Sequence, residues 1–185
     1  MLRAMAHVAP RADAALVGGT VRDALLKRAP ADVDVDVAVP RGALDLARRV
    51  ADRVGGAYLI LDAERGAARV ITESARLDVT DWRAPTLADD LMARDFTVNA
   101  LAVSLRALLR DGAAAIVDPA RGRDDLAAGR LRLPAAHVLA DDPLRALRGV
   151  RLEASLGLSL TPGATRAIRV AAPALSSVSI ERVRD

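Results

Sequence analysis

The sequence has few of the residues on which several large classes of protein depend. It contains no cysteine, two histidines, and one residue each of Trp, Tyr and Phe among 185 residues. The absence of cysteine excludes disulfides, thiolate metal sites and a cysteine nucleophile. His7 and His137 lie too far apart in sequence for a histidine-rich zinc cluster. So few aromatic rings cannot form a stacking platform for single-stranded nucleic acid, and the core must be aliphatic.

Long apolar runs and a large excess of one charge are also missing. The chain has 27 basic and 24 acidic residues, a net charge of +3, and Lys27 is its only lysine. Arginine favours bidentate contacts with phosphate, although a genomic bias towards arginine gives the same composition. No apolar run approaches the roughly 18 residues of a membrane span. Arg3, His7 and Arg11 interrupt the N-terminus before a secretory segment can form. We therefore expect a soluble, cytoplasmic protein with no membrane partner.

Enough apolar residues are present for a folded core. Hydrophobic residues make up 52% and charged residues 28% of the chain, which argues against whole-chain disorder. Apolar periodicity and turn residues predict strands at 14–17, 32–39, 57–61, 67–72, 76–82, 100–105 and 115–117, and helices at 20–28, 40–54, 87–94, 143–156, 162–172 and 179–185. Thr20 is the expected N-cap of the first helix, with Asp23 completing a variant of the capping box. The strand signal ends before Pro134. We therefore predict an α+β domain over residues 1–133 and an all-helical segment over residues 134–185.

Three acidic residues alternate with valine in the predicted strand at 32–39. Side chains two residues apart in a strand share a face, so Asp32, Asp34 and Asp36 project together while the valines face the core. Divalent cations would neutralise the repulsion, and oxygen-only ligands suit magnesium. Two metal ions could activate a hydroxyl and stabilise a leaving pyrophosphate. The alternative is an edge strand whose solvated acids discourage aggregation.

Three further segments carry polar residues suited to a nucleotide. Gly18-Gly19 stands between a strand and a helix that carries Arg22, which is an anion-binding arrangement or only a turn. An arginine, an acid and an amide cluster within residues 93–100, where a capped helix-to-strand junction is the alternative. Along residues 142–151, Asp142 and three arginines recur every three residues. This stripe on one helix face either meets an anion or is a solvated face with one ion pair between Asp142 and Arg145.

In this order, these segments resemble the class II tRNA nucleotidyltransferase and poly(A) polymerase family, the CCA-adding enzymes of the polymerase-β-like nucleotidyltransferase superfamily. The matching segments are Leu16–Leu26, Asp34-Val-Asp36, Arg94–Ala100, Asp118-Pro-Ala-Arg-Gly122, Asp142–Arg151 and Glu181-Arg182. The resemblance implies an α+β nucleotidyltransferase head, with a mixed, largely antiparallel sheet flanked by helices, followed by an all-helical neck. It covers nearly the whole chain.

The resemblance also implies a role for each candidate residue. Asp34 and Asp36 would bind two catalytic Mg²⁺ ions, supported by Asp78 on a neighbouring strand, although the spacing upstream would also allow the register Asp32/Asp34. The residues implied in nucleotide binding are Gly18, Gly19, Arg22, Arg94, Asp95, Asn99, Asp142, Arg145, Arg148 and Arg151. Within that set, Asp142 and Arg145 would read the incoming base by hydrogen bonds to its polar edge.

The expected function is Mg²⁺-dependent transfer of CMP or AMP, from CTP or ATP, to an RNA 3′ end, with tRNA as the favoured substrate. The alternatives are a nucleotide-binding regulatory module without turnover, or an RNA-binding structural head of a larger enzyme. Lys27, Ala93 and Asp141 depart from the family pattern without removing a proposed catalytic group. The family normally continues beyond the neck into body and tail regions that hold tRNA, and we expect such regions or a partner subunit to be needed for tRNA binding. The helix expected at 179–185 begins at Ser179 and has no stop signal, so it either docks on the preceding helices or continues into a longer chain.

Overall fold

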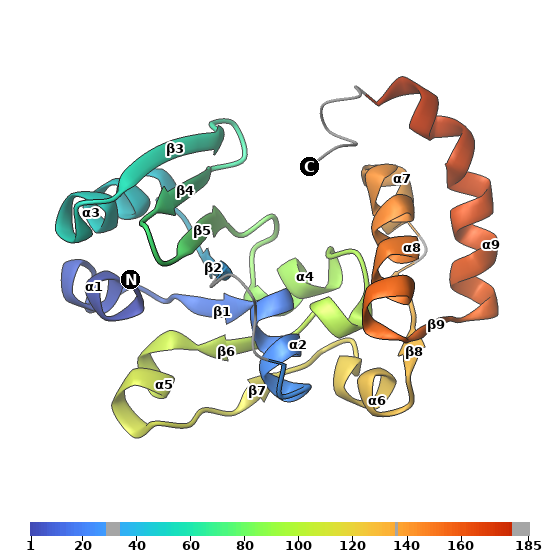
Figure 1. Ribbon diagram of the computed structural model, residues 1–185, viewed down its shortest axis with the longest axis horizontal. Helices are drawn as coiled ribbons and strands as arrows, with labels where there is room; N and C mark the ends of the chain where they lie inside the picture. Colours follow the sequence, from blue (N-terminus) through green and yellow to red (C-terminus); the bar gives the residue numbers. More distant parts are fainter. Residues whose placement is uncertain (29–33, 136, 179–185) are drawn as a thin grey trace. The chain divides into compact units, whose positions relative to one another are not determined.

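The computed structural model describes residues 1–28, 34–135 and 137–178 (Figure 1). These residues form two compact units. The first comprises Met1–Asp90 and Leu101–Val117, and the second comprises Leu91–Ala100 and the described residues from Asp118 onward. Helix α4 (Leu87–Met92) spans the first junction between them in sequence. No helix in the described ranges is both long and apolar enough to cross a membrane.

The first unit is built on a seven-stranded sheet with the order β3-β4-β5-β2-β1-β6-β7. Its strands are β1 (Ala15–Val17), β2 (Asp34–Val39), β3 (Ala57–Asp62), β4 (Ala67–Ile71), β5 (Arg76–Asp81), β6 (Ala102–Ser104) and β7 (Ile116–Val117). β2 and β5 pair in parallel and the other neighbouring strands pair antiparallel. A parallel pair requires a crossover connection, which here runs through α3 (Ala43–Val54) and the β3–β4 hairpin. The predicted mixed, largely antiparallel sheet is confirmed.

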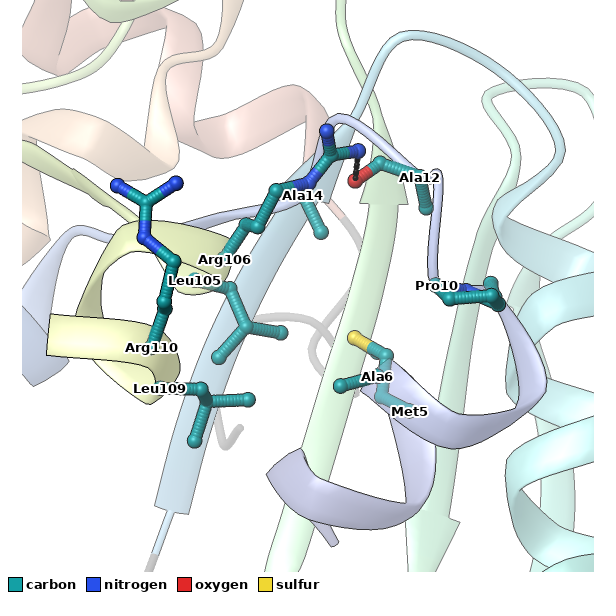
Figure 2. Close-up of a pocket in the computed structure, with 10 residues that line it drawn as sticks. Met5, Ala6, Pro10, Ala12, Ala14, Leu105, Arg106, Leu109 and Arg110 are labelled. Carbon is teal, nitrogen blue, oxygen red and sulfur yellow. Dashed lines mark hydrogen bonds between the residues drawn. The ribbon is translucent and has the colours of Figure 1, made fainter.

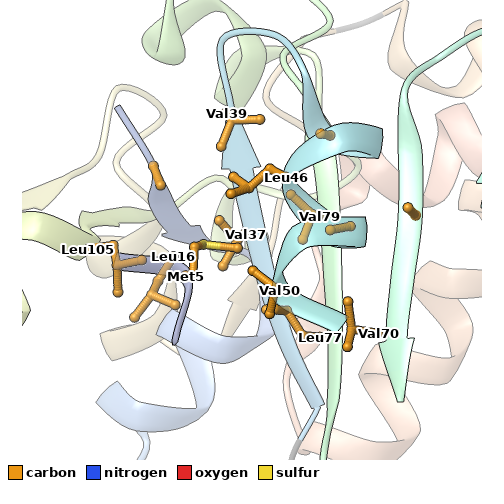
Figure 3. Close-up of a cluster of buried hydrophobic side chains, with 14 of the residues drawn as sticks. Met5, Leu16, Val37, Val39, Leu46, Val50, Val70, Leu77, Val79 and Leu105 are labelled. Atoms are coloured by element: carbon orange, nitrogen blue, oxygen red, sulfur yellow. The ribbon is translucent and has the colours of Figure 1, made fainter. Parts of the chain in front are cut away.

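The core of this unit is aliphatic and lies between the sheet and α3, with α1 (Leu2–Val8) and α5 (Leu105–Asp111) also contributing. Leu46 and Val50 of α3 point towards the valines and leucines of β2, β4 and β5 (Figure 3). Those strand residues, all fully buried, are Val37, Val39, Val70, Leu77 and Val79. Because side chains alternate along a strand, the residues between them project to the opposite face. That face of the sheet is where the polar residues of β2, β4 and β5 lie.

The second unit is mostly helical. It contains α6 (Gly122–Ala127), α7 (Val138–Asp141), α8 (Leu144–Leu156), α9 (Pro162–Ala171) and the 3-10 helices η1 (Thr97–Asn99) and η2 (Ala172–Ser177). Its core consists of Phe96, Val98, Leu131, Leu152 and Leu158. Two short strands, β8 (Arg130–Leu131) and β9 (Ser159–Leu160), pair in parallel. Among the described residues after 133, the regular elements are helices except for β9, whose pairing with β8 is a long-range contact that local periodicity does not reveal.

The local predictions were wrong at several points. The segment 100–105 is not one strand, because Ser104 ends β6 and caps α5 by accepting from the backbone N–H of Ala107 at 3.4 Å. Helices α1, α5, α6 and α7 and strands β8 and β9 were not predicted. The N-cap of α2 (Gly19–Leu25) is Gly18, so the expected Thr20–Asp23 capping box does not form. The helix expected at 179–185 lies outside the described residues, and the domain boundary near residue 133 stays a prediction.

Candidate functional site

The first group of predicted site residues lies on the polar face of the sheet. Asp34 and Asp36 are two residues apart on β2 and therefore share a face. Asp36 is directly opposite Asp78 in the parallel β2–β5 ladder, and Asp78 is directly opposite Arg69 in the antiparallel β4–β5 ladder. Residues directly opposite one another project to the same side of a sheet. One row across three strands thus reads Arg69, Asp78, Asp36.

The strand that carries the acids is an interior strand. β2 lies between β5 and β1, so the alternative of an edge strand protected by solvated acids is wrong. Asp34 and Asp36 remain exposed and half-buried, respectively, on a strand whose last three residues are buried. Asp32 lies outside the described residues. The choice between the Asp32/Asp34 and Asp34/Asp36 registers therefore stays open.

Two arginines reduce the negative charge of this face. The Nε and Nη2 of Arg69 donate to the two carboxylate oxygens of Asp78 at 2.7 and 2.8 Å. Arg76 lies opposite Asp34 and forms a longer ion pair with it at 3.7 Å. The hydrogen bond to Asp78 raises the pKa of Arg69; burial opposes this rise, and the charges of Asp78, Asp34 and Asp36 add to it. Arg69 is therefore hydrogen-bonded to Asp78 and is close enough to Asp34 and Asp36 for their charges to act on it.

Two carboxylates of this face suit a divalent cation, and a third suits it less well. Within residues 1–28, 34–135 and 137–178, no three His, Asp or Glu side chains are grouped so as to hold a metal ion. Asp34 and Asp36 nevertheless present two carboxylates on one face, which suits Mg²⁺ because that ion keeps several waters and takes phosphate oxygens from its substrate. Asp78 fits less well, because both of its oxygens accept from Arg69.

The Gly18-Gly19 turn connects β1 to α2 in the same unit. Gly18 has φ 64° and ψ −132°, a conformation that favours glycine. A Cβ on Gly19 would lie 3.4 Å from Nη2 of Arg22, so the Arg22 guanidinium lies over the second glycine. Arg22 also forms a bidentate pair with Asp23, with both distances at 2.8 Å. The turn thus brings Gly18, Gly19 and Arg22 together.

Thr20 links this turn to the acidic strand. Its hydroxyl oxygen accepts a hydrogen bond from the backbone N–H of Asp36 at 2.9 Å. The side chain that was expected to cap α2 therefore fixes the backbone of a predicted metal ligand. Sequence reasoning missed this role, and also those of Arg69 and Arg76. The available signal for Arg69 was its position on a predicted strand beside that of Asp78.

In the second unit, Asp95 is a buried carboxylate that accepts three hydrogen bonds. Its Oδ1 accepts from the backbone N–H of Phe96 at 2.8 Å and from Nδ2 of Asn99 at 3.1 Å, and its Oδ2 accepts from Nη1 of Arg148 at 3.2 Å. Burial acts to raise the pKa of Asp95, but Arg148 and the hydrogen bonds outweigh it, so the pKa lies below its usual range. Arg94, immediately before Asp95, donates its backbone N–H to the Leu91 carbonyl.

The predicted stripe along residues 142–151 is divided by burial. Arg145 is only 6% exposed and donates from Nη1 to the carbonyl oxygen of Val138 at 2.9 Å, so it does not belong to a solvated face. Asp142, at the start of α8, accepts from the backbone N–H of Leu144 at 3.2 Å. Arg148 and Arg151 are exposed. The stripe therefore brings Arg148 to Asp95, while Arg145 supports α7.

The Asp118–Gly122 motif has a structural explanation. Both Asp118 oxygens accept backbone N–H groups at the start of α6, from Gly122 at 2.6 Å and from Arg123 at 3.0 Å. The Thr97 hydroxyl donates to buried Asp125 at 2.7 Å, and Arg132 pairs with the same carboxylate at 2.8 Å. The motif thus anchors α6 within the second unit.

A pocket in the first unit is separate from these residues. It has a volume of about 270 Å³ and lies where α1 and the turn after it face α5 (Figure 2). Its lining includes Met5, Leu105 and Leu109, and Arg106 on its rim donates to the Ala12 carbonyl at 3.3 Å. No predicted site residue lines this pocket.

Comparison with known proteins places the chain in a family. The poly A polymerase head domain matches residues 14–132. The chain belongs to the class II tRNA nucleotidyltransferase and poly(A) polymerase family. It is 44% identical over 171 residues to a CC-adding tRNA nucleotidyltransferase of Geobacter sulfurreducens, covering 91% of this chain and 38% of the relative. It is 42% identical over 177 residues to an A-adding tRNA nucleotidyltransferase of Deinococcus radiodurans, covering 93% and 38%.

Solved structures of tRNA nucleotidyltransferases share the fold. A complex of a CCA-adding enzyme with ATP superposes with a TM-score of 0.81 at 26% identity, covering 99% of this chain and 45% of that one. Members of this nucleotidyltransferase family generally use a divalent metal ion. The chain spans less than half the length of these relatives. The resemblance recognised from the sequence motifs is thereby confirmed, and the individual site residues stay predictions.

Proposed function

We propose that this chain carries the catalytic head and nucleotide-selecting neck of a Mg²⁺-dependent nucleotidyltransferase, which adds CMP and/or AMP from CTP or ATP to the 3′ end of an RNA, with tRNA as its substrate. The observation that supports this proposal most strongly is that Asp34 and Asp36 share one face of an interior strand in a member of this family. The named activities of the relatives support tRNA as the substrate. In this proposal residues 1–133 form the head, residues 134–185 form the neck, and the protein acts in the cytoplasm.

Asp34 and Asp36 would hold the divalent ions, with Asp78 in support. When bound, the ions activate the RNA 3′ hydroxyl and stabilise the leaving pyrophosphate. The chain positions both carboxylates through β-sheet register and through the Thr20 hydroxyl bound to the Asp36 backbone. This chemistry depends on positioning and charge neutralisation, for which a site of acids and arginines without histidine is sufficient.

The remaining predicted residues bind the nucleoside triphosphate. The guanidinium of Arg22, which lies over Gly19, suits its phosphates, with Arg22 exchanging Asp23 for a phosphate oxygen. Gly18 shapes the turn through its positive φ, since its own N–H donates to the Leu101 carbonyl at 3.1 Å. Arg94, Asp95 and Asn99 act near the ribose and phosphates. Arg148 and Arg151 provide positive charge for the triphosphate.

Selection of the base is assigned to Asp142 and Arg145. A carboxylate accepts from the exocyclic amine of cytosine or adenine, and a guanidinium donates to ring acceptors. Uracil and guanine present a carbonyl in place of that amine, so a buried acceptor is left unpaired and these bases are rejected. The Val138 carbonyl accepts from Nη1 of Arg145, and the guanidinium has further N–H groups with which it would donate to a base.

Removal of each carboxylate tests the proposal. We expect Asp34→Ala and Asp36→Ala to abolish incorporation of labelled CMP or AMP into tRNA, because the loss of either ligand unbalances both ions. Asp32→Ala should be milder. Asp45→Ala, on the exposed surface of α3, removes the same charge and serves as the control. An inactive Asp32→Ala with an active Asp36→Ala would place the metal register two residues earlier. Incorporation at the parent rate by both Asp34→Ala and Asp36→Ala would refute the proposal.

A further inference from the structure

Arg69 lies on the same face as the predicted metal ligands, and the sequence motifs gave it no role. Its guanidinium donates two hydrogen bonds of 2.7 and 2.8 Å to Asp78, one to each oxygen. Asp78 is in turn directly opposite Asp36. Two carboxylates directly opposite one another repel, so the pairing with Arg69 removes a like-charge contact from the centre of the face.

The pair differs from an ordinary surface ion pair in its geometry. Arg69 and Asp78 are 38% and 23% exposed, and they meet as a planar fork on a carboxylate, which is the strongest form of such a pair. For Asp78 to bind a metal ion, it would have to share or give up an oxygen that Arg69 now occupies. Asp34 and Asp36 are not engaged in this way by Arg69, although they raise its pKa through their charges.

We propose that Arg69 is a positioning residue that weakens cation binding at Asp34 and Asp36 by its charge, and that Asp78 acts by holding and offsetting Arg69 rather than as a third metal ligand. This inference rests on the proposed function, since it concerns the metal affinity of the same site. In this inference, Asp78 supports Asp34 and Asp36 by offsetting the charge of Arg69.

A double-mutant cycle on the complete 185-residue chain tests the proposal. The measurement is the affinity for Mn²⁺ without nucleotide, followed by the electron paramagnetic resonance signal of the free ion. We expect Arg69→Gln to tighten Mn²⁺ binding roughly fivefold, and Asp78→Asn to weaken it by roughly five- to twentyfold, because Arg69 lies two strands and Asp78 one strand from Asp36 and the effect of a charge on a divalent ion falls with distance. The double variant restores the net charge and should bind Mn²⁺ within about fivefold of the unaltered chain.

Two control variants and a folding assay separate the effect of the Arg69 charge from a purely structural role of this residue. Arg49→Gln removes one positive charge from α3, which packs on the opposite side of the sheet, and should leave the affinity unchanged. Arg69→Lys keeps the charge without the fork and should keep the affinity within about twofold of the parent, which a purely structural role would not predict. Thermal unfolding of each variant shows whether it is folded.

Two results distinguish failure of this inference from failure of the proposed function. If the folded double variant binds Mn²⁺ more than about tenfold more weakly than the parent, Asp78 is itself a ligand and the inference is wrong. If the unaltered chain binds no Mn²⁺, or binds it equally well after Asp34→Asn and Asp36→Asn, the proposed metal site is wrong and this inference falls with it.

Discussion

Gly149 provides a sharp test of how the second unit is packed. It is a buried residue in the middle of α8, and a Cβ placed on it would lie 2.6 Å from Cζ of Phe96 and 3.0 Å from Cδ1 of Ile168. Phe96 is fully buried, so its ring has no solvent side into which it can move. We therefore expect Gly149→Ala to destabilise the protein although alanine is the better helix former.

The size of the effect follows from two opposing contributions. Replacing glycine by alanine inside a helix stabilises by about 1 kcal/mol. Overpacking a closed core costs about 1–3 kcal/mol, and a contact of 2.6 Å with a ring that cannot retreat belongs in the upper part of that range. The expected net loss is about 1–2 kcal/mol in the free energy of unfolding.

The matched control is Gly163→Ala in α9. A Cβ at Gly163 would meet nothing within 4 Å, so only the helix propensity changes, and we expect a gain of about 0.5–1 kcal/mol. Urea unfolding followed by circular dichroism should move the midpoint down for Gly149→Ala and up for Gly163→Ala, with similar slopes. If Gly149→Ala is as stable as the parent, the Phe96 ring yields and the packing argument is refuted.

Two further predictions concern the second unit. Asp95 has a folded pKa below its unfolded value of about 3.9, so its contribution to stability is present above that pH and is lost as the pH falls through the folded value. Arg148→Met should raise the pKa of Asp95 and move the acid-unfolding midpoint to higher pH. It should cost about 1–2 kcal/mol at neutral pH, less than for a fully buried pair because Arg148 is half-exposed. Arg110→Met removes an exposed arginine from its pair with Asp111 and should leave the acid-unfolding midpoint unchanged. Asp142→Ala and Arg145→Ala should relax discrimination against UTP and GTP about tenfold to a hundredfold, more than they weaken triphosphate binding. Unchanged selectivity in competition assays with the four labelled triphosphates would remove these two residues from base reading.

The features that the sequence determined by itself are those set by periodicity along the chain. Alternation in residues 34–39 places Asp34 and Asp36 on one side and valines on the other, because successive side chains in a strand point in opposite directions. The scarcity of aromatic residues predicts an aliphatic core, which the first unit has, whereas the core of the second unit includes the fully buried ring of Phe96. The spacing of residues 142–151 likewise predicts one helix that carries several arginines, as α8 does.

Tertiary structure alone decided what those side chains contact. Arg69 meets Asp78 only because the β4–β5 hairpin has one register out of several, and a shift of one residue would turn Arg69 to the apolar face. Thr20 bonds to the Asp36 backbone instead of capping its own helix, and Arg145 is buried against the Val138 carbonyl instead of facing solvent. Each of these contacts depends on how separate elements pack, since a polar group accepts whichever partner the packing brings within hydrogen-bonding distance. Local spacing fixes which face a residue occupies, whereas its partner is fixed by long-range register and packing.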